Sequence, residues 1–237
     1  TMHTVFRFLR QLLLTVLLLA LLVLVAAGGY FAVTGHKLYE SAIQVTPIDT
    51  LYSSISSREG FVPYAQLPQT YINAVISAED SRFTHHKGVD PVSIARALVT
   101  DLRTGSFAEG GSTITQQLAK NTLFTQEKHL ARKAAEMFAA LAIEKQYNKE
   151  QIFEMYVNTI YFGSGHYGIG EAAQGYFGKT PLQLTDAEAV MLGPSQCSIG
   201  LLAQQQPGPG RQADAGGAQP DGRVQKADPG AGRRPCR

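Results

Sequence analysis

Two acidic residues stand in separate polar islands of the chain, with a run of small and amide residues between them. Glu79 belongs to the segment AEDSRFTHHKG at 78–88, Glu136 ends the segment ARKAAE at 131–136, and the run GGSTITQQ occupies 110–117. Transfer of a sugar usually needs one carboxylate to move a proton at a hydroxyl and a second group to manage charge on the other side of the anomeric carbon. This arrangement therefore indicates a carbohydrate-active site.

The residues around each acid matter more than the pair itself, because a chain with 19 Asp and Glu residues contains many arbitrary pairs. Glu79 and Asp80 close an apolar helical pattern, where carboxylates are unfavourable for the helix dipole. Arg82 and Phe83 follow them after Ser81. A solvated helix end is the alternative interpretation. The adjacent pair 85–86 does not indicate a metal site, because neighbouring His side chains point apart and no ligand partner stands at helical spacing.

The small residues before the second polar segment precede a predicted helix whose first amides can hold an anion. Gln117, Lys120 and Asn121 follow along its turns. The glycine spacing is not that of a P-loop, so nucleotide binding is not indicated. An N-capped surface helix would explain the same residues.

Arg132 and Glu136 are four residues apart, which is also the spacing of an ordinary helix ion pair contributing about 0.2–0.5 kcal/mol. If Lys120 lies near Arg132 and Lys133, the cluster instead forms a cradle for a pyrophosphate, in which Arg offers paired donors and Lys a compact charge. The spacing alone leaves both possibilities open.

The composition predicts one sizeable domain with extensions in a chain of 237 residues. A formal net charge of +2 is too small to imply nucleic acid as a partner. Cys197 and Cys236 both lie in the C-terminal tail, so neither a disulfide framework nor a cysteine metal site is supported.

The N-terminus predicts a single membrane-spanning helix. Leu12–Val33 is an uncharged run of mainly Leu, Val and Ala, preceded by Arg7 and Arg10. Its length can span a bilayer, and the positive-inside tendency keeps the N-terminus cytoplasmic and the rest extracytoplasmic. A cleaved signal peptide is the alternative, but the apolar run is longer than the usual signal core. Residues 1–34 are therefore expected to form a cytoplasmic stub and anchor.

The remaining chain divides into three parts. Residues 35–66 form a polar lead-in with β-prone patches such as Ala42–Val45, and residues 67–192 form a mainly α domain. Helices are expected at about 90–103, 113–121, 127–146, 149–161, 171–177 and 185–192, with a glycine-rich loop before the fifth. Residues 193–237 have low complexity, which predicts a disordered or frameshifted tail. No Ser-x-x-Lys acylation motif follows residue 192, so no transpeptidase domain is expected.

Taken in order, the segments EDSRFTHHKG (79–88), GGSTITQQLAKN (110–121), RKAAE (132–136) and KEQIFEMYVNTIYFG (149–163) closely resemble the peptidoglycan glycosyltransferases of glycosyltransferase family 51. The resemblance covers about residues 51–192 and includes the anchor. It implies a lysozyme-like α domain with a small membrane-associated lobe, for which the apolar residues at 94–102 or 123–124 are candidates. It also implies a bacterial, single-pass membrane protein.

The resemblance implies polymerisation of lipid II, in which the 4-hydroxyl of an acceptor sugar attacks the anomeric carbon of the growing glycan chain and undecaprenyl pyrophosphate leaves. Glu79 matches the general base and Glu136 the acid that assists at the pyrophosphate. Departing negative charge would be stabilised by Lys120, Arg132 and Lys133. The positions that shape the cleft are Asp80, Phe83, His86, Ser112, Thr113, Gln117 and Asn121, and the later structural motif includes Tyr156, Asn158, Tyr161 and Gly163.

The resemblance leaves room for a divalent cation, Mg or Mn, at the pyrophosphate, and it implies no organic cofactor. The implied partners are lipid II, the growing glycan, the membrane and the cell-wall synthesis machinery. Two other functions stay open. A lysozyme-like enzyme would cut glycan, but it would leave the basic cluster unexplained because cleavage releases no pyrophosphate. An inactive, membrane-anchored protein would bind lipid II without turning it over.

Overall fold

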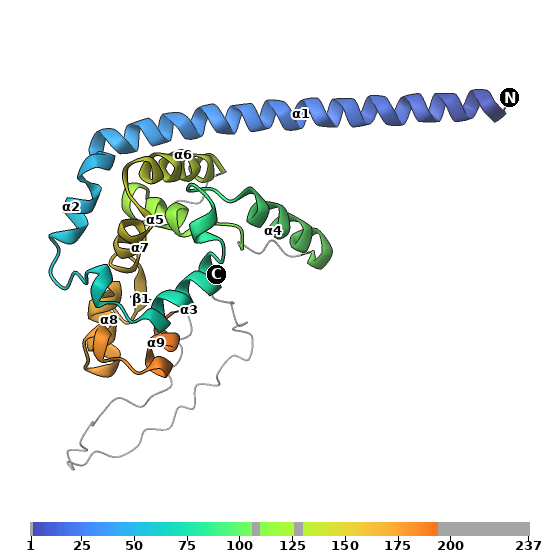
Figure 1. Cartoon of the computed structure of the whole chain (residues 1–237). Helices are drawn as coiled ribbons and strands as arrows, with labels where there is room; N and C mark the ends of the chain where they lie inside the picture. Colours follow the sequence, from blue (N-terminus) through green and yellow to red (C-terminus); the bar gives the residue numbers. More distant parts are fainter. Residues whose placement is uncertain (1, 106–109, 126–129, 194–237) are drawn as a thin grey trace, which may run out of the picture.

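The computed structural model describes residues 2–105, 110–125 and 130–193, and within these ranges the chain is mainly helical (Figure 1). The α-helices are α1 (Met2–Val45), α2 (Leu51–Ser56), α3 (Gln69–Glu79), α4 (Pro91–Thr104), α5 (Ile114–Leu123), α6 (Leu130–Gln146), α7 (Lys149–Val157), α8 (Gly168–Phe177) and α9 (Asp186–Leu192). Short 3-10 turns lie at Ile48–Thr50, Tyr64–Gln66, Phe83–His85 and Pro181–Gln183. The predicted mainly α class is confirmed, and the arrangement is consistent with a lysozyme-like domain.

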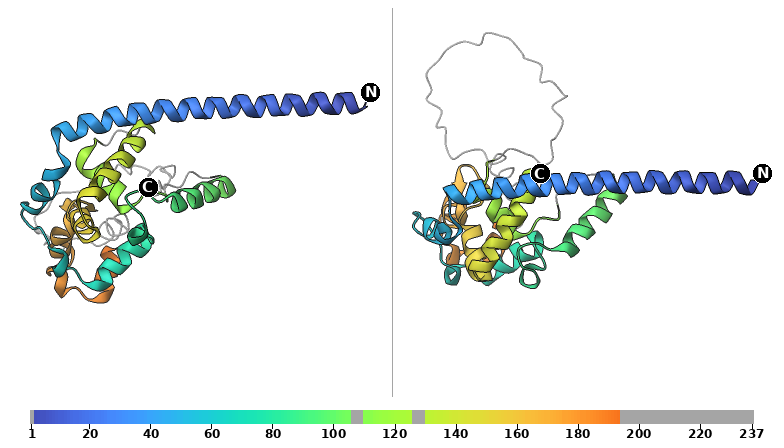
Figure 2. Two further views of the ribbon diagram at one scale, coloured as in Figure 1. Left: turned by 45° about the horizontal axis from the view of Figure 1, so that its top comes forward. Right: turned by 90° about the horizontal axis from the view of Figure 1, so that it is seen from above.

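Helix α1 is long and apolar enough to cross a membrane. Its most apolar window has a mean hydropathy of 2.8 and none of that window is buried against the rest of the protein. In two views, the N-terminal part of α1 projects far beyond the domain as a single straight helix (Figure 2). The apolar helix predicted from the composition is therefore present, and its apolar surface is free to contact lipid.

The expectation of β-prone structure at Ala42–Val45 is wrong, because α1 continues as a helix through Val45. The reason is tertiary packing. From Phe31 onward, α1 places a stripe of partly buried side chains against α6, and burial along a 3.6-residue period overrides the local preference of β-branched residues. The chain after α1 also belongs to the core, which includes Leu51, Ile55 and Val62.

The core lies where α2, α3, α5, α6, α7 and α8 meet. Its largest fully buried side chains include Tyr71, Tyr156, Phe153 and Phe162. Helix α7 is the central element, because all residues from Ile152 to Val157 are buried. Glu154 of α7 and Asn158, the residue directly after α7, hold the segment that follows α1. Glu154 accepts hydrogen bonds from the backbone of Tyr64 at 2.7 Å and from the hydroxyl of Tyr52 at 2.8 Å, and Asn158 pairs with the backbone of Val62.

Three predicted helix starts are confirmed, and a side-chain cap begins each of these helices. Asp90 caps α4 by accepting from the amide of Val92, and capping boxes begin α5 at Thr113 and α9 at Thr185. Helix α7 ends at Val157 rather than near Tyr161, because the chain turns there into a small hairpin.

The hairpin pairs β1 (Tyr161–Gly163) with β2 (His166–Tyr167). Gly163, Gly165 and Gly168 have positive φ, a conformation that only glycine adopts without strain, so the predicted glycine-rich loop is the turn region of this hairpin. The predicted helix start at 127–129 and the predicted low-complexity tail from 194 lie outside the described residues.

Candidate active site

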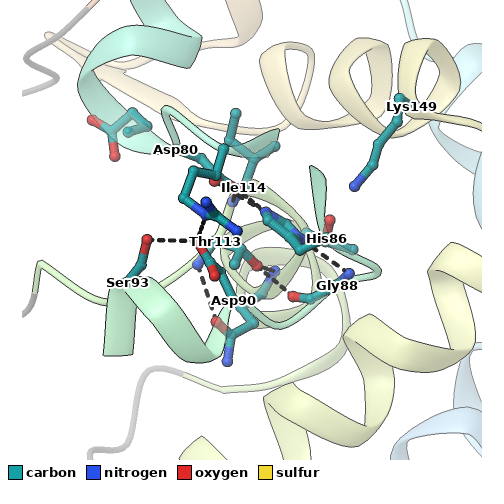
Figure 3. Close-up of polar contacts among 12 residues, drawn as sticks. Asp80, His86, Gly88, Asp90, Ser93, Thr113, Ile114 and Lys149 are labelled. Atoms are coloured by element: carbon teal, nitrogen blue, oxygen red, sulfur yellow. Dashed lines mark hydrogen bonds and ion pairs between the residues drawn. The ribbon is translucent and has the colours of Figure 1, made fainter. Parts of the chain in front are cut away.

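The segment after α3 folds back onto the start of α5 through a buried hydrogen bond between Asp80 and His86. The carboxylate of Asp80 lies 2.9 Å from Nε2 of His86, and both side chains are almost fully buried, with 2% and 3% of their surface exposed. Asp80 also accepts a hydrogen bond from the amide of Ile114 at 3.0 Å, at the N-terminus of α5. Figure 3 shows these groups together with Gly88 and Thr113. The carboxylate that is unfavourable at the end of α3 is thus stabilised by the start of α5.

The hydrogen bonds of His86 define its tautomer. The amide of Gly88 donates to Nδ1 at 3.2 Å, so Nδ1 acts as an acceptor and the proton of the neutral ring resides on Nε2, which donates to Asp80. Thr113 closes the loop by donating to the carbonyl of Gly88 at 2.6 Å. Asp80, His86 and Thr113 therefore shape the cleft by fixing the loop 80–90 against α5.

Replacement of Asp80 by Asn is expected to lower the free energy of unfolding by about 1.5–3 kcal/mol, because the negative charge to which His86 and Ile114 donate is lost and the NH2 group that replaces Oδ1 faces Nε2–H of His86. Urea unfolding of the detergent-solubilised protein measures the change. Asp49→Asn, at an exposed aspartate, is the matched control. Equal midpoints for the two variants would contradict the assigned network.

A second buried contact holds the same loop from the side of α7. Phe83 is 2% exposed, and Nζ of Lys149 lies 4.4 Å from the centre of its ring. Lys149 also pairs with Glu144 at 2.7 Å, and Glu144 accepts a hydrogen bond from Thr115 of α5. A cation over an aromatic face stabilises both groups. Phe83 therefore acts as a packing residue that joins the loop to α5, α6 and α7.

The loop is also tied to the start of α4. Arg82 lies 3.0 Å from Asp90, which accepts further hydrogen bonds from Ser93 and the amide of Val92. Burial by itself opposes ionisation of Asp90, but these hydrogen bonds and the charge of Arg82 outweigh it, so the pKa of Asp90 lies below its usual value.

Glu79 is partly exposed, unlike its neighbour. The side-chain amide of Gln117 donates to Oε2 of Glu79 at 2.9 Å, and the hydroxyl of Tyr156 donates to the amide oxygen of Gln117 at 3.2 Å. Gln117 and Tyr156 thus set the orientation of the Glu79 carboxylate.

The fully buried hydroxyl of Tyr71 has no hydrogen-bond partner among the described residues. Burial, reinforced by Tyr156 and Glu79, raises the pKa of Tyr71 well above its usual value.

A small polar cavity of about 120 Å³ opens beside Glu79. It lies between the end of α3, the start of α4 and the start of α5. The residues that line it are Ser77, Ala78, Glu79, Asp80, Ser81, Ser93, Arg96, Gly110, Ser112 and Thr113. A carboxylate, several hydroxyls and one guanidinium suit a ligand with hydroxyl and phosphate groups.

The second predicted acid lies in a cluster on α6. Glu136 is 1% exposed, and Nζ of Lys133 lies 3.0 Å from its carboxylate. Nε of Arg132 is also 3.0 Å away, close enough for an ion pair although the angles are not those of a hydrogen bond. Lys133 donates to the hydroxyl of Ser112 at 2.5 Å. Because Ser112 also lines the cavity beside Glu79, the two acidic islands meet at one site.

Lys120 and Asn121 follow Gln117 on the same side of α5, one turn further along. Among the described residues, Lys120 makes no ion pair or hydrogen bond with Glu79 or Glu136, and its membership of a pyrophosphate cradle with Arg132 and Lys133 stays a prediction. Its ammonium group pairs with no acidic residue in the described part of the chain and is open to an anionic ligand.

The residues present do not fit a metal ion held by the protein alone. The described residues contain no group of three or more His, Cys, Asp or Glu side chains that could hold an ion. The carboxylate of Glu136 already contacts two cationic side chains, whereas Mg²⁺ and Mn²⁺ need several oxygen ligands.

The sequence interpretation missed Arg96 and the serines of the cavity wall. Arg96 lies on α4, whose first two turns are otherwise apolar or small, and it points to the same cavity as Glu79. A single cation in such a stretch, six residues after an N-cap, was the available signal. Ser77, Ser81 and Ser93 gave no comparable signal, because serine is common at helix ends and turns.

The model of the family described as Transglycosylase matches residues 46–198. The chain belongs to the transglycosylase family. The matched span contains Glu79, the Ser112 contact and the α6 cluster, so the whole candidate site lies inside it.

Relatives of this chain include penicillin-binding protein 1A of Aquifex aeolicus, 47% identical over 143 residues, which are 60% of this chain and 20% of the relative. Penicillin-binding protein 1A/1B of Bacillus subtilis is 38% identical over 195 residues, 77% of this chain and 21% of the relative. Penicillin-binding protein 1A of Escherichia coli is 49% identical over 127 residues, 54% of this chain and 15% of the relative. The chain therefore matches about a fifth of the length of these proteins.

Proposed function

We propose that this transglycosylase is a membrane-anchored peptidoglycan glycosyltransferase that polymerises lipid II and releases undecaprenyl pyrophosphate. The observation that carries the proposal is the contact between Lys133 and Ser112, which places a cationic cluster beside the cavity of the partly exposed Glu79. A base next to an anion-binding cluster suits attack by a sugar hydroxyl on a carbon that carries a pyrophosphate.

In the proposed reaction, Glu79 removes the proton from the 4-hydroxyl of the acceptor sugar. Gln117 holds Oε2 of the carboxylate and leaves Oε1 to accept that proton. The acceptor oxygen forms a bond to the anomeric carbon while the bond from this carbon to the pyrophosphate oxygen breaks. The bonding electrons leave with the pyrophosphate, whose charge increases. The proton therefore ends on Glu79 and the new negative charge on the leaving group.

Arg132 and Lys133 are proposed to stabilise that charge, with Lys120 as a third cation. Glu136 orients Arg132 and Lys133 by contacting both. Arg suits paired contacts to phosphate oxygens and Lys supplies a compact charge. The described residues offer no set of ligands that would hold a metal ion by themselves, and Mg or Mn at the pyrophosphate stays a prediction. The same holds for partners in the cell-wall synthesis machinery.

The position of the cationic cluster on α6 relative to the membrane supports the proposal that the substrate is linked to a lipid. Gly35 of α1 lies against Ala131 and Ala134, beside the cluster on α6. Gly35 is two residues beyond the apolar stretch that ends at Val33, a rise of about 3 Å along the helix. The cluster thus lies near the membrane–water boundary, where the pyrophosphate of a polyprenyl lipid would be. Arg7 and Arg10 favour a cytoplasmic N-terminus and an extracytoplasmic domain.

Helix α4 is proposed as the small membrane-associated lobe. None of its residues is buried, and Val92, Leu98, Val99 and Leu102 are between 46% and 77% exposed along one stripe. In Figures 1 and 2, α4 extends on the side of the domain toward which the N-terminal part of α1 projects. An amphipathic helix with an open apolar face is suited to the membrane interface.

The membrane contact of α4 is tested by introducing one tryptophan, whose fluorescence is unambiguous because the chain contains no other tryptophan. In vesicles, Leu98→Trp is expected to show blue-shifted emission that brominated acyl chains quench, since position 98 lies on the apolar stripe. Thr100→Trp, on the other side of α4, is the matched control and is expected to show neither effect. Equal quenching at both positions would contradict membrane contact through this stripe.

The activity is tested by incubating the protein in vesicles with labelled lipid II and separating products by size. Polymer together with undecaprenyl pyrophosphate supports the proposal. Cleavage of preformed glycan without pyrophosphate would point to a lysozyme-like enzyme. Saturable binding with all lipid II intact would identify a binding protein.

A further inference from the structure

Helix α1 contacts the domain through one short stripe. Residues 6–30 of α1 are exposed, and partial burial begins at Phe31 and recurs every three or four residues to Ile43. Gly35 is the buried member of this stripe. The rings of His36 and Tyr39 lie 5.1 Å and 6.4 Å from the ring of Phe138 on α6. The stripe therefore docks the anchor helix against α6, as the two views in Figures 1 and 2 show.

The contact at Gly35 joins backbone to backbone. A Cβ atom at this position would lie 2.5 Å from Cβ of Ala134, 2.8 Å from the carbonyl oxygen of Ala131 and 3.0 Å from the amide nitrogen of Ala135. Two of these neighbours are main-chain atoms of a helix, which cannot rotate away as a flexible side chain would. By contrast, Gly28 and Gly29 of the same helix have no atom within 4 Å of such a Cβ. Only Gly35 among these three glycines is required for close packing.

Helix α6 is held from its other sides as well. A Cβ at Gly88 would lie 2.7 Å from the carbonyl oxygen of Ala140, so the loop 80–90 also packs closely against α6. Lys133 ties α6 to Ser112, and α5 packs along it. Helix α1, by contrast, contacts the domain only through its C-terminal third. A larger side chain at position 35 would therefore displace α1 and leave α6 in place.

We propose that Gly35 is a positioning residue that sets the angle and height at which the anchor carries the active site above the membrane. The inference rests on the proposed function only for its substrate. The glycine contact fixes α1 beside Ala131 and Ala135, one residue before Arg132 and Glu136 in each case. The orientation of α1 in the membrane therefore determines the orientation of the cationic cluster.

The test compares Gly35→Leu with Gly29→Leu, which adds the same side chain to the same helix where there is open space. With long-chain lipid II in vesicles, Gly35→Leu is expected to lower the polymerisation rate by about 10-fold or more, because a displacement of the substrate by about 1 Å already removes much of the rate. With a short-chain, water-soluble analogue of lipid II, both variants are expected to match the parent. Equal loss of rate on both substrates would overturn the proposal, because it would indicate a damaged domain.

A second readout does not depend on activity. Leu130→Trp places a single tryptophan at the start of α6, where the side chain is 69% exposed. Adding Gly35→Leu is expected to change its quenching by brominated lipids, whereas adding Gly29→Leu is not. Unchanged quenching would overturn the inference whether or not the parent protein makes polymer. Absence of polymer from the parent would defeat the proposed function only. Should Gly35→Leu fail to fold, Gly35→Ala, with one added methyl, is expected to show the same shift at smaller size.

Discussion

Glu79→Gln is expected to reduce polymerisation of lipid II by about 10³-fold, within the range that a positioned general base contributes. Glutamine keeps the shape of the side chain and its oxygen can still accept the hydrogen bond from Gln117, which lies 2.9 Å from Oε2 in the parent. The cavity and the cationic cluster are unchanged. What is lost is the group that accepts the proton of the sugar hydroxyl, so the effect falls on the chemical step.

The measurement is the initial rate of polymer formation from labelled lipid II, with the unfolding midpoint recorded alongside. Glu150→Gln, at an exposed glutamate in the first turn of α7, is the matched control and is expected to retain the parental rate. Glu79→Gln should also retain the affinity for lipid II, because binding depends on the cations. A rate within a few-fold of the parent would remove Glu79 from the role of base.

Glu136→Gln is expected to affect both stability and rate. Removing one partner of a buried ion pair costs about 3–5 kcal/mol, because the opposite charge is left without compensation. Arg132 is only 16% exposed, so solvent cannot replace the carboxylate there. Lys133 is 46% exposed and loses the contact that aims it at Ser112. We therefore expect a lower unfolding midpoint and a rate reduced by about 100-fold, as a lost electrostatic contact at a reacting site can cause.

Glu40→Gln is the control for this experiment, because His36 and Glu40 form a pair with the same four-residue spacing but are 49% and 55% exposed. Its effect on unfolding is expected to stay below about 1 kcal/mol. The double variant Arg132→Met/Glu136→Leu separates the two effects, because replacing both partners by apolar groups restores stability without restoring charge. Recovery of the rate in the double variant would contradict the catalytic role of the cluster.

Local signals were sufficient to locate the helices and the anchor. The caps at Asp90, Thr113 and Thr185 could be read from the sequence because a cap uses residues only two or three positions apart. The apolar helix could be read from composition, because the need to match a bilayer acts on a continuous stretch. Helix α7 was predicted too long, because its end depends on a hairpin whose pairing is not local.

The composition of the candidate site also came from sequence, through motif order and residue type. The roles within it did not. Adjacent residues Glu79 and Asp80 look equivalent in the sequence, yet one is partly exposed at a cavity and the other is buried against His86 and Ile114. The difference arises because the chain leaves α3 at this point and Asp80 turns toward another helix.

By itself, the sequence determined the mainly α class, the apolar anchor and the two acidic islands, because periodicity, capping and hydropathy act over a few neighbouring residues. The tertiary structure decided that Lys133 reaches Ser112, that α1 stays helical to Val45, and that Gly35 rests on α6. Each of these contacts joins segments more than 20 residues apart or depends on packing against such a segment. Their free energy is gained only when the helices assemble, so no local pattern records them.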